Sequence, residues 1–281
     1  MVPATDTPLY TTFLHDIELF GLVSGLRAVA KKEGPDANML MARSRQFRDA
    51  GWFIEQNQHT GCAYVSADRS RLDRLMELED REFDGGSPSD RRQTILEIGL
   101  TLGYPECCAT AFASLPIQDD SHVMGAMLGR LPNVMSPIPW ELSFLPPMVG
   151  PVFYYPCRPD CHASLDLARR YLDGLDAALP GTAASIKAKL ARPVLAAGRW
   201  DFVALDGTVD GDEVTYVDFS TPADFHNVPA PSTAFQAFIS SLPRTGRIAV
   251  RDGQALGHAH GATVATAEFT SKNGLVLLDY R

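Results

Sequence analysis

The spacing of apolar side chains changes near Gly198, and this change divides the chain into two parts. Before it, apolar residues recur every three or four positions, as at Phe13, Ile17 and Phe20, which is the period of an amphipathic helix. After it, apolar and polar residues alternate, which is the period of a β-strand. We therefore predict an α+β protein, with a mainly helical domain over residues 1–198 and a smaller α+β domain over 199–281 whose sheet is mostly antiparallel.

The same spacing predicts individual elements. We expect a helix over residues 11–32, two short strands at 52–54 and 62–65, and helix again from 159 to 197. The stretch from His122 to Pro156 contains many large apolar residues, seven prolines and few charges. Proline at that density prevents a long helix or a central strand, so this stretch is expected to be an irregular, apolar connection.

Composition excludes several classes of protein. The 281 residues include 34 acidic and 25 basic side chains, a net charge of −9 that argues against binding to duplex nucleic acid through bulk charge. No apolar run reaches the roughly 18 to 20 residues of a membrane span, and the first residues lack the basic start of a secretory signal. We therefore expect a cytoplasmic protein with no membrane partner. In that reducing compartment the five cysteines are expected to be ligands, catalysts or core residues.

Two short segments of the helical part have the same order of residue types. Residues 105–109 are Pro-Glu-Cys-Cys-Ala, and residues 159–163 are Pro-Asp-Cys-His-Ala. Proline and acidic residues favour the first turn of a helix, so each motif is expected to place its first cysteine there. The helix dipole and the unpaired N–H groups of a first turn lower the pKa of a thiol. The sequence thus predicts one metal-binding site with four thiolates, those of Cys107, Cys108, Cys157 and Cys161.

The composition of this site restricts the cofactor. Thiolates favour an iron–sulfur cluster, zinc or Cu(I) over magnesium or calcium. Side chains of adjacent cysteines are expected to diverge, which disfavours one shared tetrahedral zinc, and no C-x-x-C element is present. We therefore predict an iron–sulfur cluster, with zinc as the alternative. For a cluster, the sulfurs of Cys107 and Cys161 should lie about 6 to 7 Å apart. Thiols that are merely buried and a metal-free redox pair are the remaining interpretations.

The cysteine motifs resemble two known patterns. The run Leu102–Cys108, followed by Phe112, is similar to the G-Y-P-x-C-C-x-x-x-F signature of uncharacterised prokaryotic proteins grouped as a domain of unknown function. Residues 156–164 are similar to the second cysteine motif of that group, and this resemblance implies no reaction. The order of the five cysteines also resembles the cysteine-rich domain of heterodisulfide reductases, which binds a four-iron cluster. Here, however, the pair lacks a following glycine, and three residues separate the closing cysteines.

Catalytic roles are predicted for two residues of the motifs. If only three cysteines bind iron, Cys108 is the thiol expected to meet a substrate, and His162 is expected to transfer a proton or bind the metal. The predicted function is a redox or sulfur-transfer reaction on a small-molecule substrate. The alternative is a non-enzymatic module stabilised by zinc, whose C-terminal part over 199–281 binds a protein partner. Cys62 is expected to pack in the core, although the sequence leaves open whether it or His59 joins the site.

Overall fold

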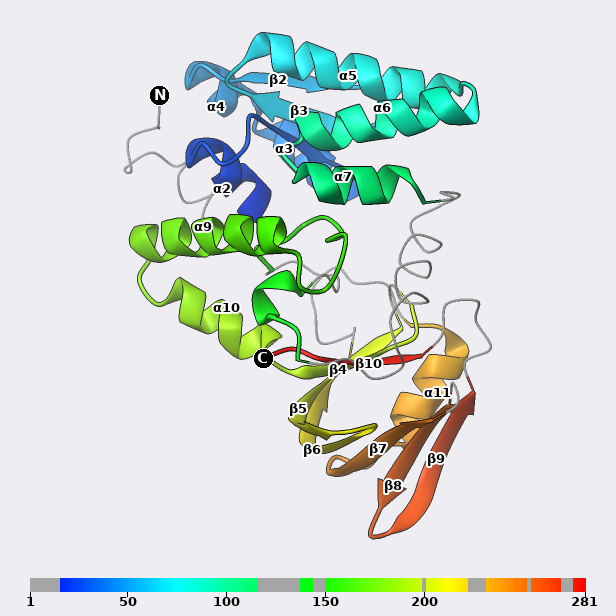
Figure 1. Cartoon of the computed structure of the whole chain (residues 1–281). Coiled ribbons are helices and arrows are strands. Elements are labelled where there is room, and N and C mark those ends of the chain that lie inside the picture. The colour runs from blue at the N-terminus through cyan, green and yellow to red at the C-terminus, as the bar shows by residue number, and fades with distance from the viewer. Residues whose placement is uncertain are drawn as a thin grey trace. The chain divides into compact units, whose positions relative to one another are not determined.

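The computed structural model describes residues 16–115, 137–143, 150–198, 201–221, 231–251, 254–268 and 275–281. The chain forms two compact units (Figure 1). Unit 1 comprises Met1–Ser114 and Pro151–Ala184, and unit 2 comprises Leu115–Gly150 and Ser185–Arg281. The α+β class and the mostly antiparallel sheet are confirmed for the described residues. The boundary at residue 198 and the order of a helical part before a sheet part stay predictions.

Unit 1 is built around a small antiparallel sheet. Its strands β1 (Val29–Lys32), β2 (Phe53–Gln56) and β3 (Ala63–Ser66) pair in the order β1-β3-β2. The helices described in this unit are α2 (Ile17–Val23), α3 (Gly34–Ala42), α4 (Ser44–Asp49), α5 (Arg69–Asp84), α6 (Pro88–Thr101), α7 (Glu106–Ala113) and α9 (His162–Ala178). Buried side chains of the sheet and α5 form a core with the end of α6, made by Val29, Cys62, Tyr64, Leu72, Leu75 and Leu102.

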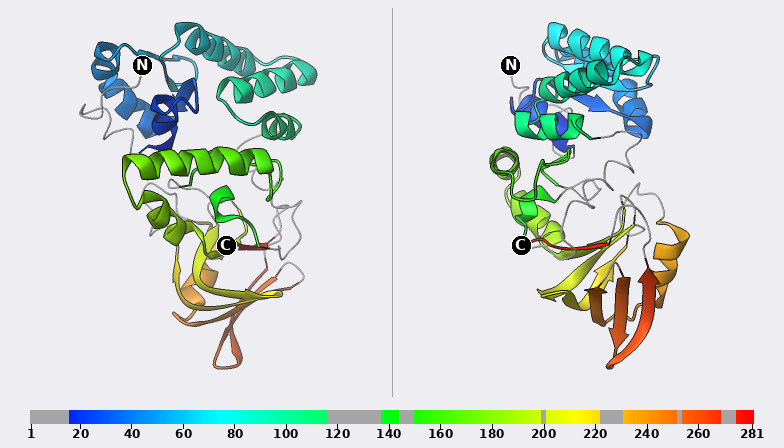
Figure 2. Two further views of the ribbon diagram at one scale, coloured as in Figure 1. Left: turned by 60° about the vertical axis from the view of Figure 1, so that its left-hand side comes forward. Right: turned by 45° about the vertical axis from the view of Figure 1, so that its right-hand side comes forward.

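Helices α5 and α6 lie side by side (Figures 1 and 2), and local sequence signals set their ends. The carboxylate of Asp68 caps α5 by accepting hydrogen bonds from the backbone N–H groups of Ser70 and Arg71. Ser87 caps α6 in the same way, and a proline follows it at the first helical position. Gly103, with a φ of 82°, turns the chain sharply after α6. This turn delivers the chain to α7, where the first cysteine motif lies.

The helix predicted over residues 11–32 is confirmed from Ile17 to Val23 and is wrong beyond that point. Helix α2 ends at Val23, Gly25 follows with a φ of 71°, and Val29–Lys32 form strand β1. The apolar residues here fit either period, and a glycine with positive φ ends the helix. The two strands predicted at 52–54 and 62–65 are confirmed as β2 and β3, each displaced by about one residue.

Unit 2 contains a seven-stranded antiparallel sheet. Its order is β10-β4-β5-β6-β7-β8-β9, so consecutive strands are neighbours except where β10 joins the edge at β4. The strands are β4 (Pro193–Ala196), β5 (Phe202–Asp210), β6 (Glu213–Ser220), β7 (Gly246–Arg251), β8 (Gln254–Ala259), β9 (Ala262–Glu268) and β10 (Val276–Asp279). Helix α11 (Thr233–Ser241) lies against this sheet (Figure 2) and adds Phe235, Phe238 and Ile239 to an apolar core.

The structure also tests the predictions for the middle of the chain. The helix predicted from 159 to 197 is present as α9 and α10 (Thr182–Leu190), but its last residues form β4 instead. Of the proline-rich stretch, only residues 137–143 and 150–156 are described, and they contain one short 3-10 turn, η1 (Trp140–Leu142). The rest of that stretch lies outside the described residues. No helix within the described ranges combines the length and apolarity that crossing a membrane requires.

Candidate metal centre

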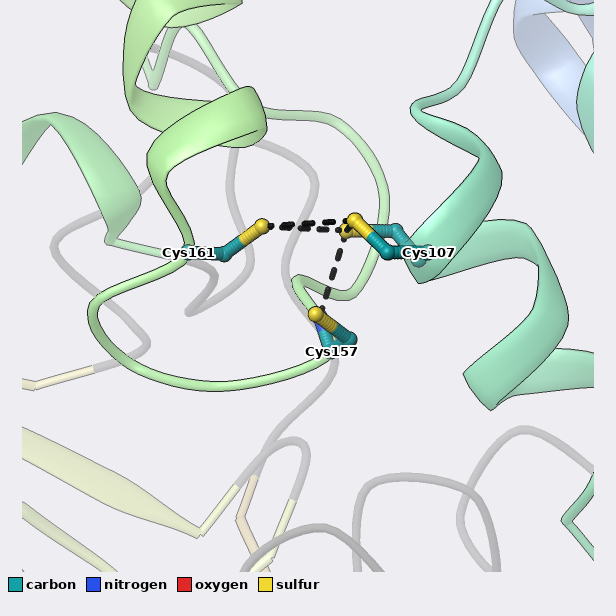
Figure 3. Close-up of side chains that lie close together, drawn as sticks. Cys107, Cys157 and Cys161 are labelled. Atoms are coloured by element: carbon teal, nitrogen blue, oxygen red, sulfur yellow. Dashed lines mark hydrogen bonds between the residues drawn. The ribbon is translucent and has the colours of Figure 1, made fainter.

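Four cysteine sulfurs meet in unit 1 (Figure 3). The Sγ atom of Cys161 lies 3.7 Å from that of Cys107 and 3.6 Å from that of Cys108, and the adjacent pair is 3.9 Å apart. With the sulfur of Cys157 included, all four lie within 4.8 Å of one another. The two cysteine motifs thus come together at one place, although 54 residues separate Cys107 from Cys161. The four residues could hold a metal ion.

The sulfur separations match the edges of one coordination tetrahedron. A zinc–sulfur bond of about 2.3 Å gives an edge of about 3.8 Å between ligand atoms. The separation of 3.7 Å between Cys107 and Cys161 is close to this edge and much shorter than the roughly 6 to 7 Å expected for an iron–sulfur cluster. The adjacent thiols were expected to diverge, yet at 3.9 Å they too span one edge. These three separations are typical of ligands on one metal ion, and with Cys157 within 4.8 Å the four cysteines are compatible with zinc or with an iron–sulfur cluster.

The first two cysteines are positioned by the way α7 packs on α6. Pro105 is the N-cap of α7, and its carbonyl accepts a hydrogen bond of 2.8 Å from the N–H of Cys108. Both cysteines lie in the first turn, as the sequence predicts for Cys107. A Cβ atom on Gly99 of α6 would lie 2.9 Å from the Cβ of Ala109, so only glycine permits this close approach of the helices.

The other two cysteines belong to the segment that leads into α9. Cys161 is the N-cap of this helix, one residue before the first turn in which the sequence predicts it. The backbone N–H of Cys157 donates a hydrogen bond of 3.3 Å to the sulfur of Cys108. The hydroxyl of Ser164, which is fully buried in α9, lies 3.1 Å from the same sulfur. These contacts hold the Cys108 sulfur between the two segments.

The surroundings shift the pKa values of Cys108, Cys157 and Cys161 in different directions. Burial raises the pKa of Cys108 well above its ordinary value, and the nearby thiol of Cys161 raises it further. Burial also raises the pKa of Cys157, to about 11. Burial alone would raise the pKa of Cys161 too, but the hydroxyl and N–H groups of Ser164 outweigh it. Together with the neighbouring thiols they bring that pKa to about 7. A metal must displace protons to bind the thiols of Cys108 and Cys157, which makes binding dependent on pH.

A buried arginine contacts the segment before each cysteine motif, and no sequence pattern predicts it. The Nε atom of Arg27 donates a hydrogen bond of 3.0 Å to the carbonyl of Leu102, 75 residues away. Its guanidinium lies 5.7 Å from the ring centre of Tyr104 and 4.3 Å from that of Phe153. Its charge is balanced by Glu18 at 3.0 Å. Arg27 therefore ties the segment before Cys107 to the segment before Cys157.

Aromatic pairs join the same two segments. Tyr104 stacks on Tyr154 with ring centres 4.7 Å apart. Phe112 of α7 is nearly parallel to Tyr155 at 6.0 Å. Such pairs contribute on the order of 1 kcal/mol each beyond the area they bury. The two cysteine segments are thus held together by apolar contacts as well as by Arg27.

The remaining candidate residues lie apart from the four sulfurs. His162 begins α9 with its side chain exposed, and it is not part of the group. Cys62 is buried in the core of unit 1 beside Tyr64, which confirms the expectation that it packs there. The ring of His59 lies 6.0 Å from that of Phe83. The catalytic roles of Cys108 and His162 stay predictions.

Comparisons of the chain with models of protein families, with curated proteins and with solved structures give no match. The resemblance of the cysteine motifs to the two patterns named above stays a prediction. What the fold and the site define is an α+β protein with four cysteines that could hold a metal.

Proposed function

We propose that this chain is a zinc-binding protein in which Cys107, Cys108, Cys157 and Cys161 hold one tetrahedral ion. The observation that carries the proposal is that the sulfurs of Cys107, Cys108 and Cys161 are 3.6 to 3.9 Å apart, close to the edge of a zinc–thiolate tetrahedron, while the sulfur of Cys157 lies within 4.8 Å of each of them. A cubane cluster would require the sulfurs to move apart by several ångströms.

The surroundings of the sulfurs support a negatively charged centre. A zinc ion with four thiolates has excess negative charge, and the cysteines that would bind it lie at the N-termini of α7 and α9, where the helix dipole favours negative charge (Figure 3). The N–H of Cys157 donates directly to the sulfur of Cys108. Hydrogen bonds of this kind stabilise thiolate ligands and fix their orientation.

The role that we propose for the ion is to hold unit 1 together. It would join the N-terminus of α7 to a segment about 50 residues later in the chain. Cross-linking distant segments lowers the entropy of the unfolded chain, and binding of a structural metal contributes directly to the free energy of folding. In this function the chain is a zinc-stabilised binding module. Residues 199–281 would bind the protein partner. A cytoplasmic location, where thiols stay reduced, is part of the same proposal.

A second candidate is the redox or sulfur-transfer reaction on a small molecule. One observation favours it: Cys107 is exposed at the edge of the site, where a substrate could reach a metal-bound thiolate. The thiol that meets the substrate would then be that of Cys107, since the side chain of Cys108 is only 1% exposed. Iron would replace zinc in this case.

Metal analysis of the full chain, purified without oxygen, tests the proposal. We expect one zinc per chain and no visible absorption. Replacement of zinc by Co²⁺ should give the intense thiolate charge-transfer and d–d bands of a tetrahedral four-sulfur site. Cys161→Ser should lose the metal, whereas the control Cys62→Ser, which changes a cysteine outside the site, should keep it. Iron with stoichiometric sulfide would favour the second candidate, and a chain that binds no metal would refute both.

A further inference from the structure

The four thiols differ sharply in their exposure. Cys107 is exposed and Cys157 is half-buried, whereas Cys108 and Cys161 are buried at 1% and 3% exposure. We propose that Cys107 is the site at which hydroperoxides oxidise the metal-bound thiolates, and that Cys161 completes a disulfide with it and releases the ion. This inference rests on the proposed zinc site and adds its regulation.

Accessibility selects Cys107 as the first thiol to react. A thiolate keeps nucleophilic lone pairs while bound to zinc, and oxidation of cysteines follows thiolate character and exposure. Hydroperoxides are small enough to approach an exposed sulfur at the edge of a site. The sulfurs of Cys108 and Cys161 are covered by protein, so they meet a peroxide only after the site has opened.

Geometry favours Cys161 over Cys108 as the second thiol. Its sulfur lies 3.7 Å from that of Cys107, slightly closer than the 3.9 Å between the adjacent cysteines. The Cα atoms of adjacent residues are about 3.8 Å apart, which is less than the roughly 4.4 to 6.8 Å that a disulfide ordinarily spans. A disulfide between Cys107 and Cys108 would therefore distort the first turn of α7. Cys161 lies on a separate segment and is free of that restriction.

The reaction balances without a further reactant. The Cys107 thiolate attacks the hydroxyl oxygen of the hydroperoxide, the O–O bond breaks, and the leaving hydroxide or alkoxide takes a proton from water. The product is a sulfenic acid on Cys107. The Cys161 thiolate then attacks this sulfur, the S–S bond forms, and hydroxide leaves and takes a second proton. Two thiolates lose two electrons in total, the peroxide gains them, and zinc keeps its charge throughout.

Loss of two ligands releases the ion. Only the thiols of Cys108 and Cys157 remain, and two thiolates do not complete the four-coordinate site that zinc requires. A dithiol reductant reverses the disulfide by thiol exchange, so the site can be reloaded. Hydroperoxide would in this way control whether unit 1 has its metal.

The test uses the full chain loaded with one zinc and treated with hydrogen peroxide. A colorimetric chelator reports released zinc, and peptide mapping by mass spectrometry locates the disulfide. We expect zinc release in step with a Cys107–Cys161 disulfide, and reloading after reduction. Cys62→Ser should release zinc at the same rate, because Cys62 lies outside the site. Cys107→Ser should slow the release at least tenfold. Equal rates in Cys107→Ser and the unchanged chain would overturn the proposal.

A second measurement needs no variant and decides the question if Cys107→Ser fails to hold zinc. The zinc-loaded chain is treated with less than one equivalent of iodoacetamide, and the alkylated residue is identified. Cys107 should be alkylated before any other cysteine. First labelling at Cys157, or a peroxide-induced Cys157–Cys161 disulfide, would overturn the role of Cys107 while leaving the zinc site intact. Failure of the unchanged chain to bind zinc at all would instead refute the proposed function.

Discussion

The two units keep distant parts of the chain together by different means. In unit 2, strands β4 to β9 follow one another in the sheet, and the residues of the core are all apolar. In unit 1, buried polar contacts join distant segments in addition to apolar ones: Arg27 bonds to a carbonyl 75 residues away, and Cys108 contacts Cys161 across 53 residues. Unit 2 therefore depends mainly on apolar area, whereas unit 1 depends on a few buried charges and thiols as well.

This difference indicates which single substitutions should have the largest effect on stability. An apolar core loses stability in proportion to the volume removed, and it is indifferent to pH and to metal. Removing one member of a buried ion pair, or one ligand of a buried metal, has a large effect on stability, because the remaining partner is left buried without compensation. The four predictions below test this contrast, and unit 2 serves as the internal control in the first three.

The largest effect is expected for Arg27→Met. The guanidinium is 1% exposed and pairs with Glu18, so its removal leaves a buried carboxylate with fewer partners. Breaking a buried pair in this way costs about 3 to 5 kcal/mol. Hydrogen exchange measured by mass spectrometry in denaturant should show this loss of stability as faster exchange in peptides from α7 and α9. Peptides from β5 to β7 should be unaffected.

The matched control for this change is Arg251→Met. Arg251 pairs with Asp212 and Glu213 on the surface of unit 2, and its side chain is 55% exposed. Exposed pairs contribute at most about 1 kcal/mol, so this variant should differ little from the unchanged chain. Comparable losses in the two variants would contradict the contrast between the units.

Removal of the proposed zinc is expected to have the next largest effect. An ion present at a hundred times its dissociation constant stabilises the folded state by about 2.7 kcal/mol. A strong chelator should therefore lower the stability of unit 1 by about this amount and leave exchange in unit 2 unchanged. Restoring zinc should restore protection in α7 and α9. Equal destabilisation of the two units would show that the ion does not act on unit 1 alone.

Ser164→Ala is expected to weaken metal binding by about tenfold while the chain stays folded. The serine hydroxyl lies 3.1 Å from the Cys108 sulfur, and residues that orient ligands typically contribute about 10- to 100-fold to affinity. Competition with a chelator of known affinity measures the change. Ser241→Ala, at the end of α11, removes a hydroxyl bonded to a helical carbonyl in unit 2 and should leave affinity unchanged. A normal affinity in Ser164→Ala would remove this residue from the site.

The smallest effect concerns acid stability. Burial alone would raise the pKa of Glu18, but Lys32 and Arg27 outweigh it and hold that pKa below its ordinary value. The stability that Glu18 contributes is therefore complete above its unfolded pKa of about 4.3, and it is lost as pH falls through the folded pKa. Urea unfolding at pH 7 and below pH 4 should show a smaller loss with acid in Glu18→Gln. If Glu18→Gln lost as much stability with acid as the unchanged chain does, Glu18 would not be a source of this pH dependence.

The sequence predicts the site better than it predicts the fold around it. The repeated order of proline, acid and cysteine marks two helix starts, and the four cysteines do lie together. The distances between the four sulfurs were not predictable, because whether adjacent thiols diverge depends on how α7 packs against its neighbours. Arg27 and Ser164 carry no local signal either, since their roles arise from contacts across the fold.

Errors in the fold have a similar origin. Apolar residues between 24 and 32 satisfy the helical period, and only pairing with β3 makes Val29–Lys32 a strand. Strands β2 and β3 were recognisable because a polar turn separates two apolar runs in the sequence itself. Local patterns therefore suffice for hairpins and helix starts, whereas elements defined by distant partners require the structure.

The separation of the two cysteine motifs has a consequence for synthesis of the chain on the ribosome. Cys161 is made 54 residues after Cys107, which at about 5 to 20 residues per second is a delay of roughly 3 to 11 s. During that interval the nascent chain presents an adjacent pair of thiols with no partner segment. A metal captured at this stage would have water or another molecule as its remaining ligands. The order of translation thus gives small thiols and metal carriers in the cell an opportunity to act on the first motif before the site is complete.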